Sequence, residues 1–228
     1  MGFLSGWFQG DRQKDLPGFA LEYLSSCDQV KRSASLEGLR FVVFDTETTS
    51  LNVKEARLLS LGAVSCTSHQ INIETALDCY VSWEESSRPE NVEIHGITKR
   101  QSDKGMTPEQ LIETFLEYIK GAVLVAHHID FDVAMVNAVL DKYYKGLSLA
   151  NPKLDTAQLA IRLEHSRFDR SNVNRKDYTL DALMERFQVT PLERHSALGD
   201  AYSTALLLMR LLYRLRKRGI DRLDKLTI

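Results

Sequence analysis

Cysteine, long apolar runs and secretory features are all scarce in this chain of 228 residues. The three cysteines form neither a C-x-x-C pair nor a disulfide framework, which argues against a disulfide-stapled scaffold and against a structural zinc site. No apolar run approaches the length of a membrane span, and the amino-terminal residues lack the charged start and apolar stretch of a secretory signal. We therefore expect reduced thiols and a cytoplasmic location.

Net charge is also nearly absent, because 29 basic and 31 acidic residues leave a formal charge of −2. Many proteins that coat duplex nucleic acid are strongly basic, so this balance disfavours such a role. It does not disfavour an enzyme that holds a short single-stranded end through local contacts and metal ions. We found no internal repeats, and the length fits one sizeable α/β domain with an appendage.

The hydrophobic pattern predicts five strands, at residues 40–49, 57–67, 70–81, 122–126 and 153–156. Helices are expected from 108 to about 120, with Thr107 as the N-cap, at about 130–144, after 156, at 179–187 and at 197–216. Three strands in an antiparallel meander, followed by alternating helices and strands, predict a mixed five-stranded sheet flanked by helices. This is the α/β arrangement of ribonuclease H-like folds.

The chain divides by pattern into three parts. Residues 1–37 form a leader with a short helical pattern around Phe19, Leu21 and Leu24, residues 38–218 form the main domain, and residues 219–228 form a short tail.

Two acids stand at the end of the first predicted strand. Asp45 and Glu47 are two residues apart, so both side chains leave the same face of the strand, and the apolar residues 41–44 anchor them. Two acids at a strand end can equally begin a solvated turn, and the pair alone does not decide between these interpretations.

Three further polar residues follow buried elements. Asp132 comes after the strand at 122–126, near the start of a helix, where an acid can also simply favour the helix dipole. Asp130 precedes the helical pattern directly, so we assign it to capping and Asp132 to metal binding. His195 and Asp200 flank the start of the last helix, whose apolar stripe is expected to hold that end against the sheet.

Converging carboxylates are what two-metal hydrolysis of a phosphodiester requires, and Mg²⁺ and Mn²⁺ favour such oxygen ligands. A neutral imidazole suits the remaining task, which is to take a proton from the attacking water, since its ordinary pKa lies near 6.5. His195 is the candidate for that task.

Taken in order, the segments FDTETTSL (44–51), HHIDFD (127–132) and HSALGD (195–200) resemble the three motifs of the DnaQ-like DEDD exonuclease superfamily. The His-x4-Asp form of the third motif is similar to the DEDDh branch, which includes the proofreading epsilon subunit of bacterial DNA polymerase III. The resemblance covers about residues 38–216. EIHGIT (93–98), LDTAQLA (154–160) and YTLDALMERF (178–187) also look like segments of that family.

The resemblance implies a role for each matching residue. Asp45 would bridge two divalent ions, Mg²⁺ or Mn²⁺, Glu47 and Asp200 would hold the ion on the nucleophile side, Asp132 would support the second ion, and His195 would be the general base. The substrate would contact Thr46, Thr48, Leu51, His95, His128 and Phe131. Ser50 and His128 depart from the family's usual glycine and asparagine, at positions expected to contact the terminal nucleotide.

The activity so implied is 3′→5′ hydrolysis at the single-stranded 3′ end of nucleic acid, with DNA of proofreading or repair type favoured over RNA and with release of 5′-mononucleotides. We expect a freestanding enzyme, or one whose leader docks a polymerase or another replication partner. The oligomeric state stays open.

Two other functions fit the sequence less well. A haloacid-dehalogenase-like phosphatase needs Asp where Glu47 stands and leaves His195 and Asp200 without a purpose. A noncatalytic nucleic-acid or polymerase-binding module would typically show a broken set of acids. Basic residues near the predicted site could contact phosphate or simply be solvated, and they are Arg162, Arg167, Arg170, Arg175 and Lys176.

Overall fold

The computed structural model describes residues 16–82, 104–165 and 173–226. In these ranges a five-stranded sheet has the order β3-β2-β1-β4-β5. The strands are β1 (Phe41–Thr48), β2 (Leu58–Cys66), β3 (Ile71–Tyr80), β4 (Val123–Ala126) and β5 (Lys153–Asp155). β1 pairs antiparallel with β2 and parallel with β4, and β2 pairs antiparallel with β3. The predicted mixed sheet with an antiparallel meander is confirmed.

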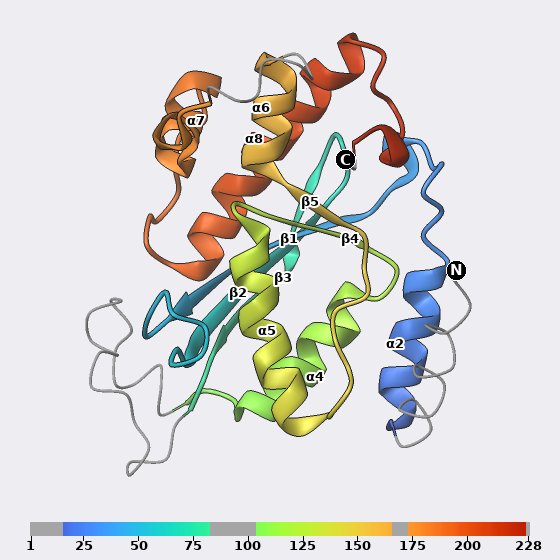
Figure 1. Cartoon of the computed structure of the whole chain (residues 1–228), viewed down its shortest axis with the longest axis vertical. Helices are drawn as coiled ribbons and strands as arrows, with labels where there is room; N and C mark the ends of the chain where they lie inside the picture. Colours follow the sequence, from blue (N-terminus) through green and yellow to red (C-terminus); the bar gives the residue numbers. More distant parts are fainter. Residues whose placement is uncertain (1–15, 83–103, 166–172, 227–228) are drawn as a thin grey trace, which may run out of the picture.

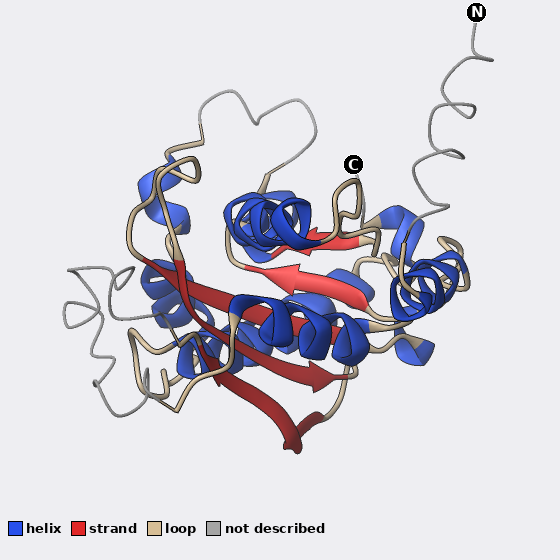
Figure 2. Ribbon diagram, turned by 90° about the horizontal axis from the view of Figure 1, so that it is seen from below, coloured by secondary structure: helices blue, strands red, loops and turns tan. Residues whose placement is uncertain are grey.

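Helices cover both faces of this sheet (Figures 1 and 2). One apolar cluster joins the sheet to α6 (Thr156–Glu164), α7 (Leu180–Phe187) and α8 (Ala197–Lys217). The other joins it to α2 (Gly18–Asp28), α4 (Pro108–Ile119) and α5 (Ile129–Tyr143). Short 3-10 helices lie at η1 (Leu36–Gly38), η4 (Arg175–Tyr178) and η5 (Leu223–Lys225). None of the helices in the described ranges is long and apolar enough to cross a membrane.

The central strand β1 contributes to both clusters because its side chains alternate between the two faces. Phe41 and Val43 pack in the cluster that contains α8, whereas Val42 and Phe44 pack in the cluster that contains α4 and α5. All four are fully buried. Burying a side chain of this size contributes roughly 1.5–3 kcal/mol, so this apolar stretch fixes the position of whatever follows it.

The apolar stripe predicted for the last helix is fully buried in the structure and holds α8 along the sheet, and its members are Ala201, Ala205, Leu208, Leu212 and Leu215. The predicted start of α4 is also confirmed. Thr107 Oγ1 accepts from the backbone N–H of Gln110, and the side chain of Gln110 accepts in return from the N–H of Thr107.

The helix predicted around Phe19, Leu21 and Leu24 is present as α2, but Leu21 lies on its exposed side. Leu21 is 45% exposed, whereas Ala20 and Tyr23 are fully buried. The Tyr23 hydroxyl donates to Asn151 Oδ1 at 2.6 Å and accepts from the N–H of Ala150 at 2.8 Å. A buried tyrosine hydroxyl usually has hydrogen-bond partners, and those of Tyr23 are distant in the sequence.

The segments after α2 and after α8 lie side by side at one end of the molecule (Figure 1). The N–H of Leu36 donates to the carbonyl of Asp221 at 2.9 Å, and the N–H of Leu223 donates to the carbonyl of Ala34 at 3.1 Å. Leu223 is fully buried in the cluster that contains α8. These bonds join the segment that follows α2 to the segment that follows α8.

Candidate active site

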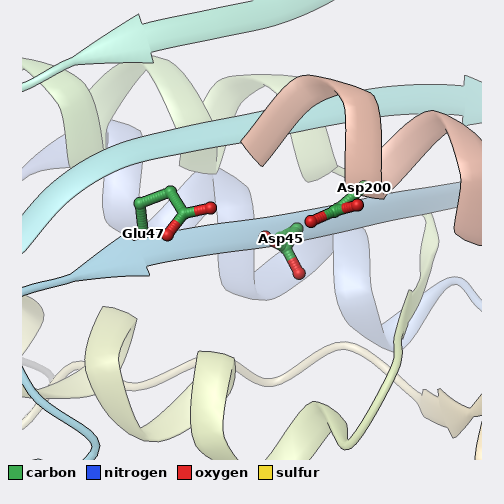
Figure 3. A group of neighbouring side chains, drawn as sticks. All are labelled: Asp45, Glu47 and Asp200. Atoms are coloured by element: carbon green, nitrogen blue, oxygen red, sulfur yellow. The ribbon is translucent and has the colours of Figure 1, made fainter. Parts of the chain in front are cut away.

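Three carboxylates meet on the face of the sheet that carries α8 (Figure 3). Asp45 and Glu47 leave β1 on this face, as their spacing predicts, and Asp200 reaches them from the first turn of α8. One oxygen from each lies within 4.8 Å of the other two. The structure therefore brings together residues that are more than 150 positions apart, in a group that could hold a metal ion.

A glycine allows α8 to come so close. Gly62 on β2 is the pairing partner of Asp45, and a Cβ built on Gly62 would lie 2.1 Å from the backbone nitrogen of Leu198. No side chain fits there, so the start of α8 rests directly on the backbone of β2. Asp200, two residues after Leu198, is thereby held beside Asp45. No local pattern in the sequence marks this glycine.

Asp132 approaches from the opposite side of β1. It lies in the first turn of α5 and is 4% exposed. Its Oδ1 accepts from the Thr46 N–H at 3.0 Å and from the Thr46 hydroxyl at 2.7 Å. Asp132 lies near enough to Asp45 to raise the pKa of that carboxyl, but it is not part of the three-acid group.

The buried acids repel one another. Burial raises the pKa of Asp45 well above its ordinary value, and the charges of Asp132, Asp200 and Glu47 raise it further. Burial followed by the charges of Asp200 and Asp132 raises the pKa of Glu47 to about 7. Burial likewise raises the pKa of Asp132 to about 7, against the lowering effect of the two bonds from Thr46. Such a group attracts cations, and its oxygen donors fit hard divalent ions such as Mg²⁺.

One cation of the chain already reaches this group. The guanidinium of Arg194 forms an ion pair with Asp200 Oδ1 and a second one with Asp181 Oδ1, where the nitrogen-to-oxygen distance is 2.7 Å. Its charge offsets part of the rise in the pKa values of Asp45 and Glu47. The motif His-x4-Asp begins one residue after Arg194, so motif reasoning missed it.

His195 lies in the turn that leads into α8, with its side chain exposed. The backbone N–H of His195 donates to Asp200 Oδ2 at 3.2 Å, which holds His195 next to the acids. Gly199 permits this turn, since a Cβ there would lie 2.3 Å from the carbonyl oxygen of Glu193. Ser196 caps α8 by accepting from the N–H of Gly199.

The capping role predicted for Asp130 is wrong. Helix α5 begins at Ile129, its N-cap is His128, and no side chain caps it. His128 has φ of 60°, so the chain turns into the helix through a left-handed residue. Asp130 instead lies exposed in the first turn, where its charge still suits the helix dipole.

The other predicted substrate residues lie in different settings. Thr46 and Thr48 are buried, and the Thr48 hydroxyl donates to the carbonyl of Ser50. Leu51 is 85% exposed, an unusual degree for a leucine. Phe131 is half-buried in the first turn of α5, and His95 lies outside the described residues, as do Arg167 and Arg170.

A cavity of about 490 Å³ opens beside the first turn of α5. Its lining includes His128, Asp155, Gln158, Arg175 and Tyr178. Asp155 is close enough to Asp132 to raise the pKa of that carboxyl, so the cavity adjoins the acids.

A family model described as exonuclease (RNase_T) matches residues 42–208, which span all the acids of the site. The chain belongs to this exonuclease family.

The curated relatives carry DNA polymerase III names. The chain is 34% identical over 194 residues to a DNA polymerase III PolC-type protein of Caldanaerobacter subterraneus subsp. tengcongensis, which covers 85% of this chain and 13% of the relative. It is 31% identical over 188 residues to a DNA polymerase III subunit epsilon-like protein of Rhodobacter capsulatus, covering 81% of this chain and 25% of the relative. The chain thus spans only a small part of each relative's length.

Solved structures share the fold. E. coli exonuclease I in complex with a dT13 oligonucleotide superimposes with a TM-score of 0.63 at 16% identity, covering 79% of this chain and 42% of that chain. The nuclease domain of 3′hExo, a DEDDh family member bound to rAMP, superimposes with a TM-score of 0.64 at 18% identity, covering 83% of this chain and 97% of that chain. Both likenesses support the ribonuclease H-like fold.

Proposed function

We propose that this chain is a metal-dependent 3′→5′ exonuclease that removes 5′-mononucleotides from single-stranded 3′ ends, with DNA as its substrate. The observation that carries the proposal is the meeting of Asp45, Glu47 and Asp200 within 4.8 Å on the buried face of the central strand. The family match and the DNA polymerase III relatives support it.

The carboxylates fit two divalent ions, Mg²⁺ or Mn²⁺. Asp45, Glu47 and Asp200 would hold one ion, and Asp132, held by its two hydrogen bonds from Thr46, would support the second together with Asp45. When bound, the ions would supply the positive charge that activates water and stabilises the leaving oxygen. Burial and the neighbouring carboxylates raise the pKa values of Asp45 and Glu47, and bound cations would offset this repulsion.

The residues of the chain would do the rest of the chemistry. His195, exposed beside Asp200, accepts a proton from the attacking water while the oxygen of that water bonds to phosphorus. The bond between phosphorus and the 3′-oxygen of the penultimate nucleotide breaks, and that oxygen takes up a proton. The products are a 5′-mononucleotide and a strand one nucleotide shorter.

The terminal nucleotide would lie between the acids and an apolar contact. Leu51 offers an almost fully exposed side chain in the loop that follows β1, which suits contact with a base. The cavity lined by His128 and Arg175 adjoins Asp132 and would take the next part of the strand. His95 and Phe131 complete the proposed substrate contacts.

The test uses a single-stranded DNA labelled at the 5′ end, incubated with the purified chain and Mg²⁺ or Mn²⁺. We expect a ladder that shortens one nucleotide at a time, which EDTA stops. D132N should abolish the ladder, whereas D141N, with the same change at an exposed position near the end of the same helix, should retain it. Loss of the 5′ label as mononucleotide in the first turnover, or release of free phosphate, would contradict the proposal.

RNA is the second candidate substrate, because the structurally similar nuclease domain of 3′hExo is bound to rAMP. A matched RNA of the same sequence decides between the two, since only contacts to the 2′-hydroxyl distinguish them. Faster shortening of the RNA would assign the chain to the exoribonucleases of the family. A polymerase or replication partner, and the leader 1–37 as its docking segment, remain part of the proposal.

A further inference from the structure

Both oxygens of Asp200 already have donors. Oδ1 pairs with the Nη1 end of Arg194, and Oδ2 accepts from the backbone N–H of His195. Asp200 is also one of the three acids whose oxygens could hold a metal ion. A divalent ion and the Arg194 guanidinium therefore compete for the same carboxylate.

Arg194 has a second anchor on the far side of its guanidinium. Nε donates to Asp181 Oδ1 at 2.8 Å, and Nη2 lies 2.7 Å from the same oxygen. Asp181 lies in the first turn of α7 and its side chain is 71% exposed, so it stands outside the three-acid group. The planar fork of arginine is suited to holding two carboxylates at once, which a lysine ammonium does not do in the same fixed geometry.

The backbone around Arg194 is constrained. Glu193 has φ of 38° and His195 has φ of 67°, so both neighbours adopt left-handed conformations that non-glycine residues rarely take. The Ser196 hydroxyl donates to the carbonyl of Glu193, and the N–H of Leu192 donates to Ser203 Oγ. These bonds hold the turn on the first turns of α8 and direct Arg194 toward the acids.

We propose that Arg194 is the internal counter-ion of the metal-free acids: it holds Asp200 while no divalent ion is bound and gives it up when an ion binds, remaining attached to Asp181. The inference rests on the proposed metal site. It makes Arg194 a positioning residue, because it stabilises the arrangement of the acids before loading. It also means that the ion binds less tightly than the acids alone would allow.

Mn²⁺ binding, followed by the decrease in the electron paramagnetic resonance signal of free Mn²⁺, tests this without any substrate. R194Q should bind Mn²⁺ about fivefold more tightly, on the order of what a partly buried ion pair contributes. In EDTA the same variant should unfold at a lower temperature than the wild type. R194K, which keeps the charge but not the fork, should also bind Mn²⁺ more tightly than the wild type.

Controls separate the exchange from a general effect of charge. R186Q removes the same charge from α7, where Arg186 pairs with Glu164, and should leave Mn²⁺ binding unchanged. D181N should weaken Mn²⁺ binding. Without the Asp181 charge, Arg194 keeps Asp200 as its ion-pair partner and competes more strongly with the ion. In the R194Q background, D181N should have no further effect, since Asp181 acts through Arg194.

The outcomes are distinguishable. Unchanged or weaker Mn²⁺ binding by a folded R194Q or R194K would overturn the role of Arg194 and leave the exonuclease proposal intact. Failure of the wild type to bind Mn²⁺ any better than D45N does would overturn both. If R194Q does not fold, the R194K and D181N titrations still decide the matter.

Discussion

Replacing Gly62 with alanine should separate the two elements that form the site. The new Cβ would lie 2.1 Å from Leu198 N and 2.2 Å from the carbonyl carbon of Ala197, against 3.4 Å or more in ordinary contacts. The start of α8 must therefore retreat by more than about 1 Å. Overpacking of this kind costs roughly 1–3 kcal/mol, and a displacement of about 1 Å at a reacting group costs about 100-fold in rate.

Two measurements check G62A. Guanidinium denaturation should show the loss of stability, and shortening of labelled single-stranded DNA in excess Mn²⁺ should show the loss of rate. G38A is the matched control, because a Cβ on Gly38 meets nothing within 4 Å. Adding L198A should not rescue G62A, since the clashing atoms are backbone. A G62A protein with wild-type stability and wild-type rate would refute the reasoning that close approach of α8 positions Asp200.

Three further changes test other parts of the structure. The pKa of Glu47, raised to about 7, means that its protonation favours the metal-free fold. That contribution is fully present below the ordinary pKa near 4.5 and is lost as the pH rises through about 7. The stability of the wild type relative to E47Q in EDTA should therefore fall by roughly 1–2 kcal/mol between pH 5 and pH 8, after a discount for solvent screening. A stability difference that does not change with pH would contradict this expectation. T46V removes the hydroxyl that donates to Asp132 and should weaken Mn²⁺ binding several-fold in titrations, while equal affinity would show that this bond does not position the acid. Y23F leaves Asn151 Oδ1 and the N–H of Ala150 without their partner and should cost about 1–3 kcal/mol in chemical denaturation, and no loss would mean that α2 is not fixed by these bonds.

The elements that could be predicted from the sequence are those whose pattern is local. The alternation along β1 put Asp45 and Glu47 on one face, and the 3.6-residue period of α8 put its five stripe residues in the core. The same kind of reasoning failed where one residue changed the start of an element. His128, the N-cap of α5, has a left-handed conformation, and the helix begins at Ile129. Asp130 therefore lies inside the first turn and cannot be the N-cap.

Other features depend on contacts between distant segments, which no local pattern contains. Leu21 reads as apolar at helical spacing, yet the face that meets the core is the one with Ala20 and Tyr23. Gly62 is an ordinary strand residue until α8 lies on it, and Arg194 is an ordinary surface cation until Asp181 and Asp200 stand on either side. The three-dimensional arrangement was needed to see them.

The alternation of β1 makes its length as important as its composition. One extra residue between Phe44 and Asp45 would turn both acids away from α8 and toward α5, and would move Thr46 to the α8 side, away from its partner Asp132. Insertions in this family member should therefore be tolerated in the loop after Thr48 long before they are tolerated within the strand, and natural variation along β1 should change side chains without changing their count.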